Sequence, residues 1–204
     1  MTGHLPNVTL NVIAGPTASG KSKLALDLAL ATGAEIVSAD SQQVYRHFDI
    51  GTAKPTPEEL AAVPHHLISV VDPLADFSAA QFQKLADEAI LSIAARGCSV
   101  VVVGGTGLYL RILLRGIIAA PARDEALRAQ FEALADSEGN EALHRRLNAV
   151  DPDEARRLPP SDRVRIIRAL EIHALTGQTA TSLRAAHQFD QPRYRYRLWV
   201  LSPD

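Results

Sequence analysis

Apolar residues gather in five short runs along the chain, each typical of a β-strand. Leu10–Ala14 and Val100–Val103 contain β-branched residues and suit central strands that are buried on both faces. Glu35–Ala39 and His66–Val71 predict two further strands. Arg195–Leu201 alternates only weakly and predicts a last strand.

Between these runs, apolar residues recur at the spacing of a helix. Leu24, Leu28 and Ala31 predict a helix that ends at Gly33. The segment 49–57 is too rich in glycine and proline for a regular element and predicts a surface loop.

A longer helix is predicted from Ser78, an N-cap residue, to Ala95, with Gly97 as its stop. Its expected apolar face consists of Phe82, Leu85, Ala89 and Ile93. Another helix is predicted over Leu108–Leu114. Strands that alternate with helices predict βαβ units and a parallel sheet.

Beyond Gly116 the pattern changes. Residues 123–171 show helical spacing, interrupted at Gly139 and at Pro159-Pro160, and contain no strand candidate. We therefore expect three parts: an α/β core over residues 1–116, a helical insertion over 117–192, and a return strand over 193–204.

Composition and charge narrow the class of protein. The 204 residues are 47% hydrophobic and 22% charged, as in ordinary globular proteins. The single cysteine, Cys98, excludes an internal disulfide, and no run approaches the roughly 18 apolar residues of a membrane helix, so we expect a cytoplasmic protein. The net charge of −2 conceals a basic stretch, His144–Arg197, with 11 arginines against 6 acidic residues.

The stretch Gly15–Ser22 matches the P-loop pattern completely and lies between a predicted strand and a predicted helix. Its members are Gly15, Pro16, Thr17, Ala18, Ser19, Gly20, Lys21 and Ser22. Glycines let backbone N–H groups converge on a phosphate, and the helix N-terminus adds its positive dipole end. Lys21 suits a terminal phosphate oxygen, and Ser22 is the usual ligand position for Mg²⁺. We therefore expect an α/β fold with a P-loop nucleoside-triphosphatase-like parallel sheet flanked by helices and an α-helical insertion.

Asp40 is the candidate carboxylate of this site. P-loop hydrolases normally carry an acid after a second strand, but Val100–Val103 is followed by Gly104-Gly105-Thr106. Asp40 instead follows the strand Glu35–Ala39, whose end is expected to open toward the same crevice as the P-loop. It could hold Mg²⁺, accept a proton from a nucleophile, or merely cap the next helix.

Six motifs follow one another in the chain: Gly15–Ser22, Ser38–Tyr45, Asp49–Pro55, Pro64–Leu67, Val103–Tyr109 and Arg165–Glu171. In this order they closely resemble the tRNA dimethylallyltransferases, also called tRNA isopentenyltransferases. The resemblance covers nearly the whole chain. It implies transfer of a dimethylallyl group from dimethylallyl diphosphate to N6 of the adenosine 3′ of the anticodon in tRNA, with Mg²⁺ as cofactor.

The resemblance also implies roles for individual residues. Asp40 takes the proton from adenine N6, and Thr17 hydrogen-bonds the leaving oxygen. Lys21 and Ser22, with Mg²⁺, neutralise the diphosphate, and Thr106 lies near the reacting base. The residues implied to contact the nucleotide are Asp40, Ser41, Gln42 and Gln43.

For the rest of the tRNA, the resemblance implies contacts from Arg128 and from the run Val164, Arg165, Ile166, Ile167 and Arg168. From the sequence alone, the residues of this run have two different roles. Ile166 and Ile167 are expected to face the core. Arg165 and Arg168 share one helix face and suit a phosphate. The alternative is a face of ion pairs with Asp162 and Glu171.

Two other classes of function stay open from the residues: a nucleotide-dependent small-molecule kinase, and a tRNA-binding module without activity. The second arises because members of the resembled family usually run on past the position of Asp204, so the sequence is expected to be a fragment or a shortened protein. We expect a monomer without membrane contact. His65-His66 lacks a third ligand at suitable spacing, which argues against a metal site there.

Overall fold

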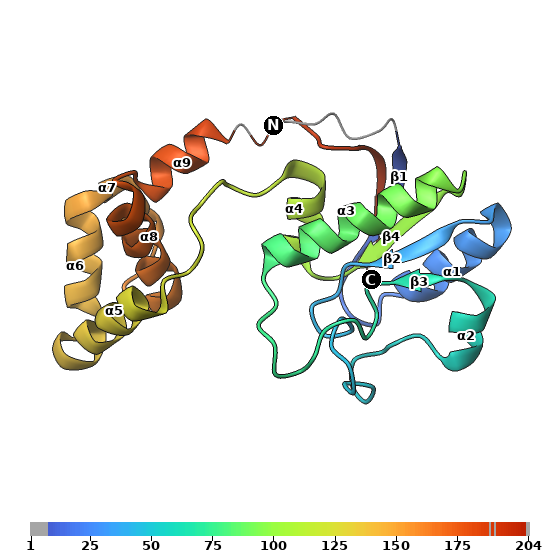
Figure 1. Cartoon of the computed structure of the whole chain (residues 1–204), viewed down its shortest axis with the longest axis horizontal. Helices are drawn as coiled ribbons and strands as arrows, with labels where there is room; N and C mark the ends of the chain where they lie inside the picture. Colours follow the sequence, from blue (N-terminus) through green and yellow to red (C-terminus); the bar gives the residue numbers. More distant parts are fainter. Residues whose placement is uncertain (1–7, 188, 190, 203–204) are drawn as a thin grey trace. The chain divides into compact units, whose positions relative to one another are not determined.

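The computed structural model describes residues 8–187, 189 and 191–202. The chain divides into two compact units, one formed by residues 1–116 and 189–204 and the other by residues 117–188. Each unit is described by itself (Figure 1).

The first unit is built on a parallel sheet of five strands. In chain order these are β1 (Thr9–Ala14), β2 (Glu35–Ser38), β3 (His65–His66), β4 (Val100–Gly104) and β5 (Arg195–Val200). They lie in the order β3-β2-β4-β1-β5, and every pairing is parallel. The predicted parallel α/β sheet is therefore confirmed, with β1 between β4 and the return strand.

Four helices accompany this sheet: α1 (Lys21–Thr32), α2 (Pro57–Ala62), α3 (Ala79–Ala95) and α4 (Gly107–Arg115). Alternate strand residues point to opposite faces of the sheet. Leu10, Val12 and Val102 therefore pack with α3 and α4, whereas Ile13 and Val101 pack with α1. Helices on both faces bury most side chains of the central strands, which explains their continuous apolar runs.

The helix predicted from Leu24, Leu28 and Ala31 is confirmed as α1, and of these three residues Leu28 packs against the core. Ala25 and Ala29 are the buried residues of the helix, whereas Leu24 is 41% exposed and Ala31 is also exposed. The small alanine side chains let the helix lie close to β1 and β4. The predicted end is confirmed, because Gly33 caps the helix with a φ of 65°, a conformation that glycine adopts without strain.

The third strand is much shorter than the predicted His66–Val71. Leu67 and Ser69 have φ angles of 63° and 53°, which are incompatible with extended backbone. Pairing therefore stops after His66, and Val71 returns only as an isolated bridge to Tyr45.

The start of α3 agrees with the prediction. The Ser78 hydroxyl accepts a hydrogen bond from Gln81 N at 3.2 Å, and the Gln81 side chain accepts one from Ser78 N at 2.7 Å. The buried side chains of this helix are Phe82, Ala86, Ile90 and Ile93. Two of the four predicted face residues, Leu85 and Ala89, lie at the edge of that face and are half-buried.

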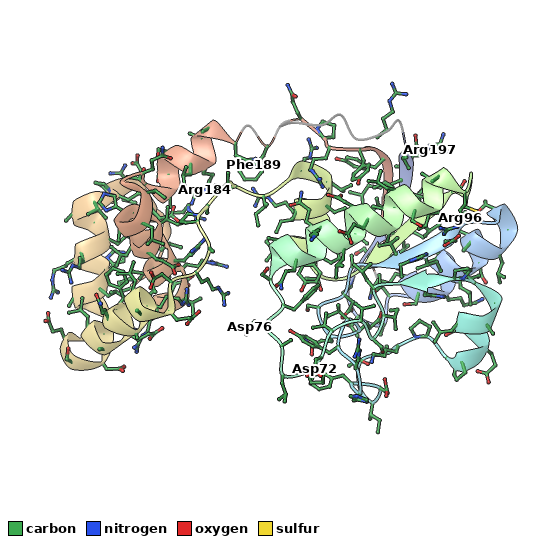
Figure 2. The ribbon with its side chains drawn as sticks, viewed as in Figure 1. Asp72, Asp76, Arg96, Arg184, Phe189 and Arg197 are labelled. Carbon is green, nitrogen blue, oxygen red and sulfur yellow. The ribbon has the colours of Figure 1, made fainter. Side chains whose placement is uncertain are left out.

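Glu35 begins β2 and is buried between two basic side chains. Arg96, which is labelled in Figure 2, contacts both carboxylate oxygens at 2.7 Å. His66 Nε2 lies 2.6 Å from Oε2. His65 Nδ1 lies 2.7 Å from the carbonyl oxygen of Val63, so the two neighbouring histidines have different partners. Burial would raise the pKa of Glu35, but the hydrogen bonds from Arg96 and His66 outweigh burial and lower it.

This lowered pKa predicts a pH-dependent contribution to folding. A carboxylate with a depressed folded-state pKa stabilises the protein above its unfolded pKa, about 4.3 for glutamate, and loses that contribution as pH falls through the folded value. We expect Glu35→Gln to lower the free energy of unfolding at pH 7 and to differ less from the unsubstituted protein below about pH 4. Urea unfolding at both pH values measures this, and a difference that does not depend on pH would contradict it.

The described residues of the second unit form helices and the segments that connect them. Its helices are α5 (Glu125–Glu138), α6 (Asn140–Val150), α7 (Pro152–Arg157), α8 (Arg163–Thr176) and α9 (Ala180–Ala186). Leu143, Leu147, Ile166 and Ile167 are completely buried in its core. Within the described part of the chain, no helix is long and apolar enough to cross a membrane.

Candidate functional site

The P-loop connects β1 to α1 through a tightly packed turn. A side chain at Gly15 would lie 2.7 Å from Ser19 Oγ and 2.9 Å from the carbonyl oxygen of Leu201, so only glycine fits there. Gly20 has a φ of 82° and begins α1, and Ala18 has a φ of 65°. The turn thereby places the N-terminus of α1, with its positive dipole end, at the mouth of the loop.

The segment after β4 closes the other side of the P-loop. A Cβ on Gly105 would lie 3.2 Å from the Gly15 carbonyl oxygen and 3.7 Å from Lys21 Nζ. The Lys21 ammonium donates a hydrogen bond to the Pro16 carbonyl at 3.0 Å. A side chain at 105 would press on the Gly15 carbonyl oxygen, so the close approach of the two segments favours glycine at this point.

A cavity of about 410 Å³ brings the P-loop together with Asp40. Its lining includes Thr17, Lys21 and Ser22 from the loop, and Asp40 and Gln42 from the segment after β2. The expectation that the ends of β1 and β2 open into one crevice is therefore confirmed.

One oxygen of Asp40 holds the local backbone. Asp40 Oδ1 accepts hydrogen bonds from Gln42 N at 2.8 Å and Gln43 N at 3.2 Å. These bonds hold a turn at residues 41–44, and not a helix as the capping alternative supposed. A second carboxylate oxygen is available on the same side chain for chemistry in the cavity.

Thr106 contacts the segment after Asp40 and does not line this cavity. Its hydroxyl oxygen accepts a hydrogen bond from Ser41 N at 3.1 Å and lies 3.3 Å from Ser41 Oγ. Thr106 thereby joins the end of β4 to the residue that follows Asp40. This contact fixes the backbone on which the Asp40 carboxylate is carried.

The far wall of the cavity was not foreseen from the sequence. It is formed by Gly51, Thr52 and Ala53. The Gln43 side-chain amide donates to the carbonyl oxygens of Thr52 at 3.1 Å and Ala53 at 2.8 Å, and it accepts from Ser38 Oγ at 3.0 Å. The glycine- and proline-rich composition predicted a loop here, but only the contacts of Gln43 show that it is folded against the site.

Lys54 fixes the same loop from inside. Its side chain is 7% exposed, and its ammonium donates to the Tyr45 carbonyl at 2.7 Å and to Asp49 at 2.8 Å. Burying the hydrocarbon stem while pairing the charged end is the usual way in which a lysine is accommodated inside a protein. The cavity wall is therefore held by two buried or half-buried polar side chains, Gln43 and Lys54.

An aromatic array lies beside the cavity. Tyr109 stacks on the buried Phe82 with ring centres 4.1 Å apart and meets Phe77 edge-on at 6.3 Å. Tyr45 continues the array at 6.5 Å from Phe77. Burial raises the pKa of Tyr109, and the charges of Tyr45 and Asp40 add to the rise, so the Tyr109 hydroxyl stays protonated.

The donors in the cavity fit a magnesium ion. Ser22 and Asp40 both line it and supply the oxygen ligands that Mg²⁺ prefers. Among the described residues there is no group of three or more His, Cys, Asp or Glu side chains that could hold a metal ion. The residues therefore suit an ion bound through one or two protein oxygens together with phosphate oxygens and water.

The arginines predicted to contact tRNA lie in the helical unit, where several are engaged in ion pairs. Arg168 lies 2.5 Å and Arg128 3.7 Å from the completely buried Glu171. Arg168 also donates to the Pro121 carbonyl at 2.6 Å. The other Glu171 oxygen accepts from Asp124 N at 2.7 Å. The ion-pair alternative is thus observed for both arginines, since Arg168 pairs with Glu171 and Arg165 pairs with Asp162.

The remaining members of the run differ in exposure. Arg165 is 69% exposed and pairs with Asp162 at 3.0 Å, and Val164 is also exposed. Ile166 and Ile167 are completely buried, so their side chains contribute to the core and cannot contact a partner in this structure. Arg165 and Val164 are the surface-accessible side chains among these four.

A parallel sheet in which the inner strand β1 ends in this loop defines the first unit as a P-loop α/β protein. Residues 43–204 match the family model described as IPP transferase. The chain therefore belongs to the IPP transferase family, which confirms the resemblance seen in its motifs.

Two relatives and one solved structure are similar over most of the chain. A tRNA dimethylallyltransferase of Myxococcus xanthus is 65% identical, with 95% of this chain and 63% of the relative covered. One from Anaeromyxobacter is 58% identical, with 95% and 64% covered. A crystal structure described as a eukaryotic dimethylallyltransferase acting on tRNA has a TM-score of 0.84 at 29% identity, covering 97% of this chain and 49% of that one. The chain thus spans less than two thirds of the length of these relatives.

Proposed function

We propose that this chain carries the diphosphate site and the catalytic base of a tRNA dimethylallyltransferase. The reaction transfers a dimethylallyl group from dimethylallyl diphosphate to N6 of the adenosine 3′ of the anticodon and releases diphosphate. The observation that supports this most directly is the shared cavity, in which Asp40 lies with a complete P-loop. The relatives named tRNA dimethylallyltransferase support it independently.

In this proposal the P-loop holds a leaving group. The backbone N–H groups of Gly15–Ser22 and the Lys21 ammonium stabilise the negative charge that builds as the carbon–oxygen bond of the diphosphate breaks. Thr17, which lines the cavity, donates a hydrogen bond to the leaving oxygen. A bound Mg²⁺, with Ser22 as its protein ligand, supplies further charge neutralisation.

Asp40 acts on the other reactant. As adenine N6 forms its bond to the dimethylallyl carbon, the amine must lose a proton, and Asp40 accepts it. Gln42 N and Gln43 N hold Oδ1, so the side chain is oriented before the substrate arrives. Thr106 is a positioning residue in this scheme, because it acts on Asp40 through Ser41.

The kinase alternative is less well supported. A P-loop kinase needs a group that activates the acceptor and an acid that supports magnesium. Among the residues that the structure describes, Asp40 is the single carboxylate that lines this cavity, and glycines follow β4 where a second acid would be expected. One carboxylate suffices for transfer to an amine, because no water has to be positioned.

Arg165 provides a test of the proposed tRNA contact. We expect Arg165→Ala to weaken tRNA binding and to reduce the slope of log affinity against log salt by about one, since one phosphate contact is lost. Arg165 is exposed and forms a surface ion pair with Asp162, so the fold should be kept. Binding measured between low and moderate salt checks this, with the exposed Arg145→Ala as control. An unchanged slope would show that Arg165 forms a surface ion pair and does not contact a phosphate of the tRNA.

The activity itself is tested by incubating the chain with dimethylallyl diphosphate, Mg²⁺ and unmodified tRNA. Digestion to nucleosides should yield prenylated adenosine. Product from a form as long as the relatives but not from this chain would support the alternative of a tRNA-binding module that lacks activity by itself. Phosphate transfer from ATP to a small molecule would support the kinase. The expectations of a monomer and of a cytoplasmic location remain predictions.

A further inference from the structure

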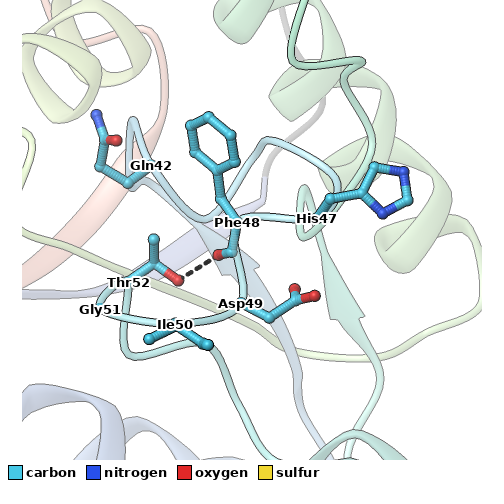
Figure 3. A pocket seen from close by; sticks show the side chains of 7 residues that line it. All are labelled: Gln42, His47, Phe48, Asp49, Ile50, Gly51 and Thr52. Carbon is cyan, nitrogen blue, oxygen red and sulfur yellow. Dashed lines mark hydrogen bonds between the residues drawn. The ribbon is translucent and has the colours of Figure 1, made fainter.

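A second cavity of about 540 Å³ adjoins the P-loop cavity and has no role in the reaction described above. Its lining is formed by Gln42 and by the loop from His47 to Thr52 (Figure 3). Gln42, Gly51 and Thr52 belong to both cavities, so the two spaces share a wall. The volume is in the range of small-molecule sites.

The apolar side chains that line this second cavity are those of Phe48 and Ile50. Phe48 is 42% exposed, and its ring centre lies 5.6 Å from that of Tyr45. Tyr45 continues through Phe77 to Tyr109, which stacks on the buried Phe82. Phe48 is therefore the outer end of an array of five rings that begins in the core, and it offers an exposed ring on a rigid support.

The loop that carries Phe48 is held in place by polar contacts. Thr52 Oγ1 donates to the Phe48 carbonyl at 2.6 Å (Figure 3), and Lys54 ties Tyr45 to Asp49 beneath it. His47 and Gly51 have φ angles of 62° and 80°, so the loop turns sharply on both sides of Phe48. Figure 3 shows the side chains of Gln42 and Phe48 directed to the same side of the loop, with His47 turned away from them.

We propose that this second cavity binds the base of a nucleotide next to the acceptor adenosine, stacked on Phe48 and hydrogen-bonded by the Gln42 amide. The inference rests on the proposed function, because an adenosine that enters the P-loop cavity brings its neighbours to the shared wall. Proteins commonly bind the unstacked bases of RNA loops on aromatic side chains and through hydrogen bonds to base edges. Lys54 neutralises the Asp49 carboxylate, so the wall does not repel the RNA backbone.

Stacking of the neighbouring base on Phe48 would also offset part of the energy needed to unstack the acceptor adenosine. Moving one adenosine out of a loop costs unstacking energy, which new contacts must offset. A ring on which the adjacent base can stack replaces part of the stacking that is lost. The second cavity thus helps to present the acceptor base to Asp40 without touching it.

The test measures binding of a fluorescently labelled, unmodified anticodon stem-loop RNA to the chain in the presence of inorganic pyrophosphate and Mg²⁺. We expect Phe48→Ala to weaken binding by about tenfold and Phe48→Trp to preserve it, since a base–aromatic stack has that magnitude. The matched control is Leu30→Ala, which removes a 56% exposed apolar side chain on α1, away from both cavities. Pyrophosphate binding by Phe48→Ala should equal that of the unsubstituted chain, which shows that the fold and the P-loop are intact.

A double-mutant cycle gives the decisive result. Stem-loops with an abasic site at either neighbour of the acceptor adenosine should bind less tightly, and at one of the two positions the loss should not add to that of Phe48→Ala. Full additivity at both positions, or unchanged binding by Phe48→Ala, would overturn the second cavity as a base site while leaving the proposed function standing. Failure of the unsubstituted chain to bind any stem-loop would count against both.

Discussion

Asp40→Asn is expected to lower the rate of prenyl transfer by about a hundredfold or more while leaving diphosphate binding unchanged. The amide keeps the size of the side chain, and its oxygen can still accept from Gln42 N and Gln43 N, as Asp40 Oδ1 does. It cannot accept a proton from adenine N6. The substitution therefore removes the base and keeps the local fold.

The measurement is the single-turnover rate with saturating tRNA, alongside the dissociation constant for pyrophosphate. Asp40→Ala is the matched variant, because it removes both the base and the contacts to the two backbone N–H groups. We expect it to be at least as slow and also less stable. Turnover by Asp40→Asn at the unsubstituted rate would rule out Asp40 as the base.

Glu171→Ala is expected to destabilise the helical unit by about 3–5 kcal/mol. Glu171 is completely buried and is the shared partner of Arg168, Arg128 and the backbone N–H of Asp124. Its removal leaves buried or half-buried donors without their acceptor, and this loss of partners is what makes the change costly.

Arg165→Ala is the control for this second prediction. It breaks an exposed ion pair on the same helix and should change the free energy of unfolding by less than about 1 kcal/mol. Chemical unfolding followed by circular dichroism compares the two variants. Equal stabilities would show that Glu171 does not organise the unit. The same reasoning implies that substituting Arg168 tests stability and RNA binding together, whereas Arg165 tests RNA binding almost alone.

The sequence was sufficient for the elements that build the P-loop cavity. Leu10–Ala14, the loop Gly15–Ser22 and the carboxylate of Asp40 each carry a local signal, and strand order in a parallel sheet brings them together. The helical character of residues 123–171 was equally clear, since it depends on periodicity and on helix stops.

Where the prediction failed, the deciding information was not local. The spacing of the leucines predicted the helix α1 but not which side chains it buries, because close packing on the sheet selects Ala25 and Ala29. The short β3 depends on positive φ angles at Leu67 and Ser69, which ordinary side chains give no reason to expect.

The contacts that form the cavity wall, and the burial of the arginines' carboxylate partners, could not be predicted from the sequence either. Gln43 was expected to contact the nucleotide, but its side-chain amide makes three hydrogen bonds within the protein. Arg165 and Arg168 look equivalent at their i,i+3 spacing, but their carboxylate partners differ in burial from 24% to 0% exposed. Such differences arise from contacts between distant segments.

In the proposed reaction, the P-loop binds the diphosphate leaving group while Asp40 deprotonates adenine N6 of the acceptor. The most direct measurement is the amount of pyrophosphate released against the amount of prenylated adenosine formed, with tRNA present and omitted. We expect one pyrophosphate to be released for each modified adenosine, and none when tRNA is omitted. Pyrophosphate or phosphate released at the same rate without tRNA would contradict it, because the loop would then serve hydrolysis.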